Sequence, residues 1–134
     1  MSKPLDVAYQ NIRQILEDAR RTAYTAVNVA MVQAYWNIGR IIVEEEQGGK
    51  TRAGYGEYLL KELSVRLTND FGKGFDEGNL RNMRKFNTVF PMRDAVHHEL
   101  SWTQYRLLLK VEKYDVRQFY ISECIQNNWS TLIL

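Results

Sequence analysis

The chain is poor in the residues that cross-link or interrupt a polypeptide. It has one cysteine, Cys124, so no disulfide can form within the 134 residues. Its two prolines, Pro4 and Pro91, lie at or beyond the ends of helical patterns rather than inside them. The N-terminus shows no basic-then-apolar signal pattern, and a lone thiol is typical of a reducing compartment. These absences favour long uninterrupted helices and predict a cytoplasmic location.

Two further absences limit the partners that the chain can have. No apolar run approaches the roughly 20 residues that a membrane span needs, so no membrane partner is expected. The 18 basic and 16 acidic side chains give a formal charge of +2, which is too balanced to indicate nucleic acid by itself. The composition is 45% hydrophobic and 12% aromatic, which is enough for one packed core. We therefore expect a single folded domain over residues 1–134.

Apolar residues recur at helical spacing along the first third of the chain. Between residues 5 and 47 they follow mostly at steps of three or four and form one stripe on a helix that is either long or gently broken, with Gly39 as its one weak point. The stripe contains Leu5, Ile12, Leu16, Ala19, Ala23, Val27, Ala30, Ala34, Ile38 and Ile41. The acidic run at residues 44–46 lies at the end of the helix where its dipole disfavours acids, and we interpret the run as a solvated face.

Two more helices are expected on either side of the short turn Gly72-Lys73-Gly74. The first covers residues 57–71, and one side of it carries Leu59, Leu60, Leu63, Leu67 and Phe71. The second covers residues 76–90, because Asp76 is a good N-cap and Pro91 disfavours helical geometry in the residue before it. Two helices joined by a glycine-containing turn match a helix-turn-helix, although this turn is slightly longer than usual.

Capping residues predict the helices near the C-terminus. Ser101 with Gln104 forms a capping box, and Asp115 with Gln118 repeats that arrangement. The second of these helices is expected to bury Phe119, Tyr120, Cys124 and Ile125. Ser130 predicts one more helix start. Because no segment alternates between apolar and polar residues over a useful length, the predicted fold class is all-α.

The helix over residues 76–90 presents two different faces. At about 100° per residue, its apolar and basic positions fall on nearly opposite sides. The inward face consists of Leu80, Met83, Phe86 and Phe90, and the outward face of Arg81, Arg84, Lys85 and Thr88.

The segment around this helix is locally basic, because residues 71–93 contain five basic and two acidic side chains. Guanidinium, ammonium and amide groups of this kind contact phosphates and base edges. The candidate nucleic-acid-binding residues are Lys73, Asn79, Arg81, Asn82, Arg84 and Lys85. The alternative is a solvated face that serves solubility.

The chain offers few residues for catalysis. His97 and His98 are adjacent, so on a regular element they point in different directions and do not form a metal-binding pair. Cys124 lies in an amphipathic helix and is expected to be a buried structural thiol. Metal-dependent nucleases need clustered carboxylates with a nearby lysine, and no Glu-x-Lys triplet occurs in the chain. We expect no catalytic residue, no metal site and no cofactor.

Two features have a second possible reading. The aromatic pairs Tyr35-Trp36 and Trp102 with Tyr105 could stack on single-stranded bases, but aromatics at helical spacing beside apolar residues are more often core, and we place them there. The first helix is longer than a small domain needs to cover itself, so part of its stripe could pair with another chain. A homodimer through this N-terminal helix is the resulting hypothesis.

Five spaced motifs in order resemble a known family. They are Tyr35-Trp36-Asn37-Ile38-Gly39, Gly74-Phe75 with Asn79-Leu80, Met83-Arg84 with Phe86, Leu100-Ser101-Trp102-Thr103 with Tyr105, and Asn128-Trp129-Ser130. From about Tyr9 to its last residue, the chain resembles the N-terminal domain of YhcG-type proteins. The resemblance departs from the family pattern at Asp76, where a serine is common, but both residues are good caps.

The resemblance implies a helical, winged-helix-like or helix-turn-helix-like DNA-recognition domain that precedes a PD-(D/E)xK nuclease domain. The catalytic residues of that family lie in the downstream part, so none can be carried over to this sequence. The apolar ending at residues 132–134 agrees with this, because it reads as a cut through a further helix.

Two functions follow as hypotheses. The first is a duplex-DNA targeting module of a nuclease that acts in DNA recombination, repair or defence. The second is a dimerisation or protein-interaction domain without direct nucleic-acid contact. RNA in place of DNA is not excluded by any residue.

Overall fold

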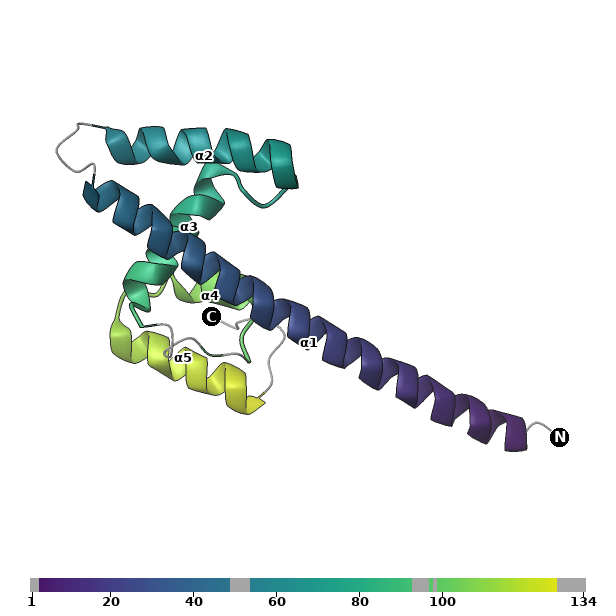
Figure 1. Ribbon diagram of the computed structural model, residues 1–134. Coiled ribbons are helices and arrows are strands. Elements are labelled where there is room, and N and C mark those ends of the chain that lie inside the picture. Colours follow the sequence, from purple (N-terminus) through teal and green to yellow (C-terminus); the bar gives the residue numbers. More distant parts are fainter. Residues whose placement is uncertain (1–2, 49–53, 93–96, 98, 128–134) are drawn as a thin grey trace.

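The computed structural model describes residues 3–48, 54–92, 97 and 99–127, and these form five helices (Figure 1). The helices are α1 (Lys3–Gly48), α2 (Tyr55–Phe71), α3 (Glu77–Val89), α4 (Trp102–Leu108) and α5 (Tyr114–Asn127). The described residues contain no strand, which confirms the all-α class. A wing is a β-hairpin, so the winged-helix form of the prediction finds no counterpart in this part of the chain.

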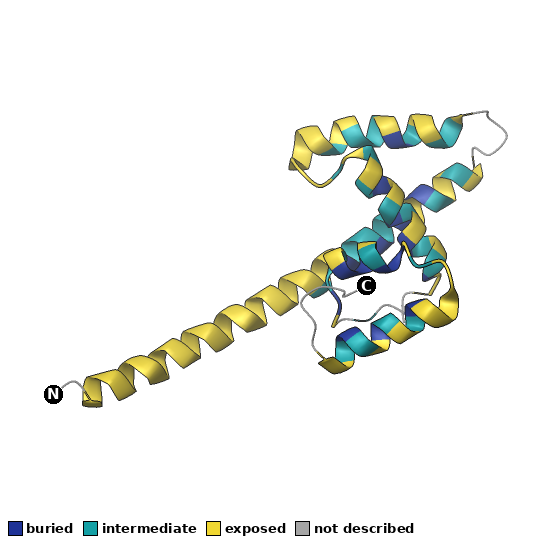
Figure 2. Ribbon diagram, turned by 180° about the vertical axis from the view of Figure 1, so that it is seen from behind, coloured by how far each residue is buried: buried dark blue, intermediate teal, exposed yellow. Residues whose placement is uncertain are grey.

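Helix α1 is continuous over 46 residues, so of the two predicted forms the long helix is correct and the gently broken one is not. At 1.5 Å per residue it is about 69 Å long, which is much longer than the rest of the fold requires. Every residue from 3 to 28 is exposed, and this segment projects from the body of the molecule (Figure 2). We call residues 3–28 the arm. Only the C-terminal part of α1 packs against the other helices.

Helix α3 crosses the C-terminal part of α1 (Figure 1). Gly39 lies where the two backbones meet. A Cβ atom at position 39 would overlap the backbone carbonyl oxygen of Met83 and would crowd the side chain of Asn87. The interpretation of Gly39 as a weak point of the helix was therefore wrong. The glycine allows a close approach of α3 to an unbroken α1.

Two clusters of buried side chains form the core on either side of this crossing. One joins Ile42 of α1 to Leu60 of α2 and to Leu80 and Met83 of α3. The other is larger and holds Val32, Trp36, Phe86, Phe90, Leu100, Tyr105, Leu108, Leu109, Ile121 and Cys124. The predicted burial of the Cys124 thiol is confirmed, and this burial raises its pKa.

Aromatic rings make up much of the larger cluster. The ring of Phe86 lies 4.6 Å from that of Tyr105 and 5.3 Å from that of Trp102, measured between centroids. The indole nitrogen of Trp36 donates a buried hydrogen bond of 2.7 Å to the carbonyl oxygen of Phe90. Tyr35 also packs on Trp102, with the ring centroids 4.9 Å apart. The prediction that these aromatics belong to the core is confirmed.

The capping predictions were correct at two of three helices. The carboxylate of Asp76 accepts a 2.7 Å hydrogen bond from the backbone N–H of Asn79, and Ser101 and Gln104 form both bonds of a capping box. Helix α5 begins at Tyr114, so Asp115 lies inside its first turn and does not cap it. The predicted helix start at Ser130 lies outside the described residues.

Two predicted core residues are exposed instead. Phe71 is the last residue of α2 and extends beyond the contact with α3, so 70% of it is exposed. Phe119 is 57% exposed because α5 turns a different face inward. That face carries Arg117, whose guanidinium donates to the carbonyl oxygen of Val111 and lies over the ring of Phe90. An arginine with these partners was not expected on a buried face.

Candidate nucleic-acid interface

Helix α3 has the two faces that its sequence predicted. Leu80, Met83 and Phe86 are completely buried, and Phe90, which follows the helix, is 4% exposed. On the outer side, Arg81, Lys85 and Thr88 are exposed, while Asn82 and Arg84 are half-buried. The apolar side of α3 is thus the centre of the core, and its basic side reaches solvent.

The basic side of α3 borders an open groove with a volume of about 700 Å³. The other wall of the groove is the end of α1, which contributes Val43, Glu46 and Gln47. The residues of α3 that line the groove are Arg81, Asn82, Arg84, Lys85 and Thr88. Four of the six predicted binding residues therefore meet at one site, and we call it the α1–α3 groove.

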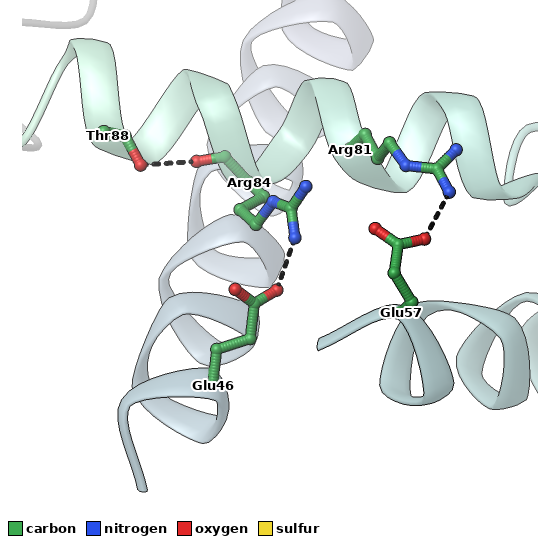
Figure 3. Close-up of polar contacts among 5 residues, drawn as sticks. All are labelled: Glu46, Glu57, Arg81, Arg84 and Thr88. Atoms are coloured by element: carbon green, nitrogen blue, oxygen red, sulfur yellow. Dashed lines mark hydrogen bonds and ion pairs between the residues drawn. The ribbon is translucent and has the colours of Figure 1, made fainter. Parts of the chain in front are cut away.

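Two glutamates from neighbouring helices pair with the arginines of α3 (Figure 3). Arg84 binds Glu46 of α1 through Nη1 and Oε1, and Arg81 binds Glu57 of α2 through Nη2 and Oε2, both at 2.7 Å. The hydrogen bond and charge of Arg81 lower the pKa of Glu57, and Glu57 raises the pKa of Arg81 in return. Glu46 was interpreted as part of a solvated run, but it is half-buried and holds Arg84 at the groove.

The remaining predicted residues lie apart from the groove or have a structural task. The amide of Asn79 donates to the carbonyl oxygen of Gly74 and accepts from the indole nitrogen of Trp102 at 3.1 Å. It thereby ties the turn before α3 to helix α4. Lys73 is exposed in that turn and does not line the groove. Asn79 is therefore engaged within the fold, whereas Lys73 faces solvent beside it.

A second, smaller hollow continues the basic surface beyond Asn82. It has a volume of about 230 Å³ and is lined by Asn82, Thr103 and Leu107 together with the exposed Arg106 and Lys110. Arg106 and Lys110 were not among the predicted binding residues, because Arg106 lies in α4 and Lys110 in the turn after it, away from the helix whose basic face was predicted. Since Asn82 borders both hollows, the basic side chains of α3 and of the α4 region form one surface.

The described residues provide little for metal chemistry or membrane insertion. No three His, Cys, Asp or Glu side chains within them lie close enough together to hold a metal ion. No helix in the same residues is both long and apolar enough to cross a membrane.

The fold and the groove define a helical domain with a basic, solvent-facing surface and no assembled metal centre in its described part. Residues 11–134 match the DUF1016 N-terminal domain, and the chain belongs to that family. It is 40% identical over 105 residues to a protein of Escherichia coli (strain K12) named "Putative nuclease YhcG", a match that covers 75% of this chain. The matched region is 28% of the length of that protein. No solved structure matches the chain. The chain is thus a YhcG-type N-terminal domain, as the five motifs indicated.

Proposed function

We propose that this domain binds duplex DNA through the α1–α3 groove and targets a nuclease domain that follows it in the same cytoplasmic protein. The observation that carries the proposal is the convergence of Arg81, Arg84 and Lys85 on one open groove. The relative named as a nuclease supports the second half of the proposal. In this view the domain supplies the position of the nuclease, and the downstream part supplies the chemistry, in recombination, repair or defence.

The ion pairs at the groove are compatible with phosphate binding. The side chains of Arg81 and Glu57 are 43% and 64% exposed, so water screens their attraction and the pair is easily exchanged. A DNA phosphate can replace the carboxylate and releases condensed counterions as it binds. The glutamates hold the guanidinium groups at the groove before DNA arrives, and they also compete with it. Helices α2 and α3 correspond to the two helices of a helix-turn-helix in this proposal.

The proposal is tested by duplex-binding measurements at two salt concentrations on the triple variant Arg81→Ala/Arg84→Ala/Lys85→Ala. Loss of about three phosphate contacts should reduce the slope of log affinity against log salt by roughly 2.7. The matched control is Arg13→Ala/Arg20→Ala/Arg21→Ala, which removes the same charge from the exposed arm. Equal weakening in both variants would show that only net charge matters and would overturn the groove assignment.

A second measurement uses a variant that should increase, rather than decrease, the affinity for duplex DNA. Glu57→Gln frees Arg81 without removing a positive charge, and we expect tighter binding of the duplex with unchanged helical content by circular dichroism. An unchanged or weaker affinity would contradict competition between Glu57 and phosphate. Single-stranded DNA and duplex RNA of the same sequence identify the preferred nucleic acid.

A second candidate function is dimerisation or protein interaction, and the exposed arm favours it. The arm carries large apolar side chains that no described part of the chain covers, among them Leu5, Ile12 and Leu16 at 57–70% exposure. Large contiguous apolar patches on a protein surface typically mark interaction sites. Light scattering on the chain tests this function, because a strict monomer counts against self-association.

A further inference from the structure

Most of the apolar stripe of α1 lies away from the face that contacts the body, and Ile38 is the stripe residue that packs against the core. The body packs against Val32, Trp36 and Ile42, which are 1–7% exposed. Val27 precedes Val32 by five residues, which is a rotation of about 140° around the helix axis. Stripe residues on the other side remain open, with Val27 60% and Ile41 51% exposed. The stripe therefore faces solvent along the arm and at Ile41, and it is half-buried at Ala34 and Ile38.

The exposed area of the chain exceeds that of a compact monomer. Its accessible surface is 9618 Å², whereas a compact protein of 15.8 kDa exposes about 7,300 Å². The excess of about 2,300 Å² per chain is comparable to what permanent homodimers bury. The chain thus has enough uncovered surface to form a stable interface with a second copy.

Apart from Ile38, the residues of the stripe are spaced in the same way in both directions from Ala23, in pairs at equal sequence distances before and after it. The pairs are Ala19 and Val27 at four residues, Leu16 and Ala30 at seven, Ile12 and Ala34 at eleven, and Leu5 and Ile41 at eighteen. We propose that two copies of α1 pair antiparallel along this stripe, with the two-fold axis at Ala23. Each large side chain of the inner pairs then lies against an alanine, which fills the interface evenly. The proposal rests on the second candidate function, dimerisation or protein interaction. It specifies a second copy of the chain as the partner and antiparallel pairing of α1 as the geometry.

The charges at the end of α1 support the antiparallel direction. Glu44 and Glu45 are exposed, and the last turn of α1 holds no basic residue, so its own dipole disfavours these acids. In an antiparallel pair they lie beside the N-terminus of the other α1, where the dipole favours acids. A parallel pair would bring four such carboxylates together at one end.

Cysteine cross-linking in a Cys124→Ala background tests the geometry. Oxidised Ala23→Cys should form a covalent dimer by itself, because each position 23 meets its own copy at the axis. Leu5→Cys and Ile41→Cys should each remain uncross-linked alone and should form a mixed disulfide when the two proteins are combined. A disulfide dimer of Leu5→Cys alone would overturn the antiparallel arrangement, because it requires parallel helices.

Light scattering with a matched pair of arm variants separates this inference from the broader function. We expect a dimer for the wild type, an increase in the dimer dissociation constant of at least about tenfold for Leu16→Glu, and no change for Thr25→Glu. Thr25 is exposed on the opposite face of the arm. A monomeric wild type would overturn both the inference and self-association. A dimer that Leu16→Glu leaves intact would overturn only the pairing along the stripe.

Discussion

The arm of α1 and helix α3 have the same kind of sequence pattern and opposite environments. Both place apolar residues on one face at helical spacing. In α3 that face is covered by its neighbours, and Leu80, Met83 and Phe86 are completely buried. In the arm, Leu5 and Leu16 keep 70% and 57% of their surface exposed. Helical spacing therefore shows that a face is suited to burial, but it does not show whether the same chain buries it.

The largest expected effect contrasts one leucine from each region. Leu80→Ala opens a cavity in the core and should lower the free energy of unfolding by about 2–5 kcal/mol. Leu16→Ala should change it by less than about 0.5 kcal/mol at a dilution where the chain is monomeric. Denaturant titration followed by tryptophan fluorescence measures both, because Trp36 and Trp102 lie in the core. A large loss of monomer stability from Leu16→Ala would show that the arm, like α3, is buried within its own chain, which would contradict the comparison.

A smaller effect is expected at the contact between α1 and α3. Gly39→Ala forces the backbones of the two helices apart and should cost about 1–3 kcal/mol of unfolding free energy. Gly48→Ala is the control within the same helix, since nothing lies within 4 Å of a Cβ atom there. Thermal unfolding of the two variants measures the difference. Similar melting temperatures would show that the approach of α3 does not depend on the glycine.

The smallest effect is a pH dependence of the body that the arm lacks. Burial of the phenol raises the pKa of Tyr105, although a hydrogen bond from the backbone N–H of His97 opposes this. The unfolded chain then loses this proton near pH 10 while the folded chain keeps it, so stability falls as the pH rises above 10. The loss is at most about 1.4 kcal/mol per pH unit.

Tyr105→Phe should flatten this alkaline decrease in a denaturation series between pH 8 and pH 11. Tyr24→Phe is the matched control variant, because it removes a hydroxyl from a tyrosine that is 69% exposed in the arm. The phenylalanine at position 105 also loses the hydrogen bond of 3.0 Å from the hydroxyl to the carbonyl oxygen of His97, so the variant is less stable at neutral pH. Only the slope with pH therefore reports the titration.

Local signals predicted much of the fold. The Asp76 cap, the Ser101 capping box and the apolar spacing placed α1, α3 and α4 close to their observed ends, because these features act within a few residues. The orientation of α5 was not predictable in the same way. It depends on Arg117 finding a carbonyl oxygen and an aromatic ring on other segments. The spacing of apolar residues alone had predicted that Phe119 lies on the buried face of α5.

The site was predictable in its basic part and not in its acidic part. Arg81, Arg84 and Lys85 follow from one helical face, which can be read from a single segment. Glu46 and Glu57 reach the same place from α1 and α2, 38 and 24 residues away from their partners along the chain. No local pattern connects residues at such separations, so the pairing of charges at the groove required the tertiary structure.

The arm also has a consequence for the order of the chain itself. A helix without tertiary contacts depends on its own helix–coil equilibrium, which is marginal in water even for favourable sequences. The arm has only local support of this kind, such as the exposed pair of Arg13 and Glu17 at 2.9 Å. Its amides should therefore exchange with solvent hydrogen much faster than those of α3 when the chain is dilute. Association would then order the segment, and the helical content of the protein would rise with its concentration.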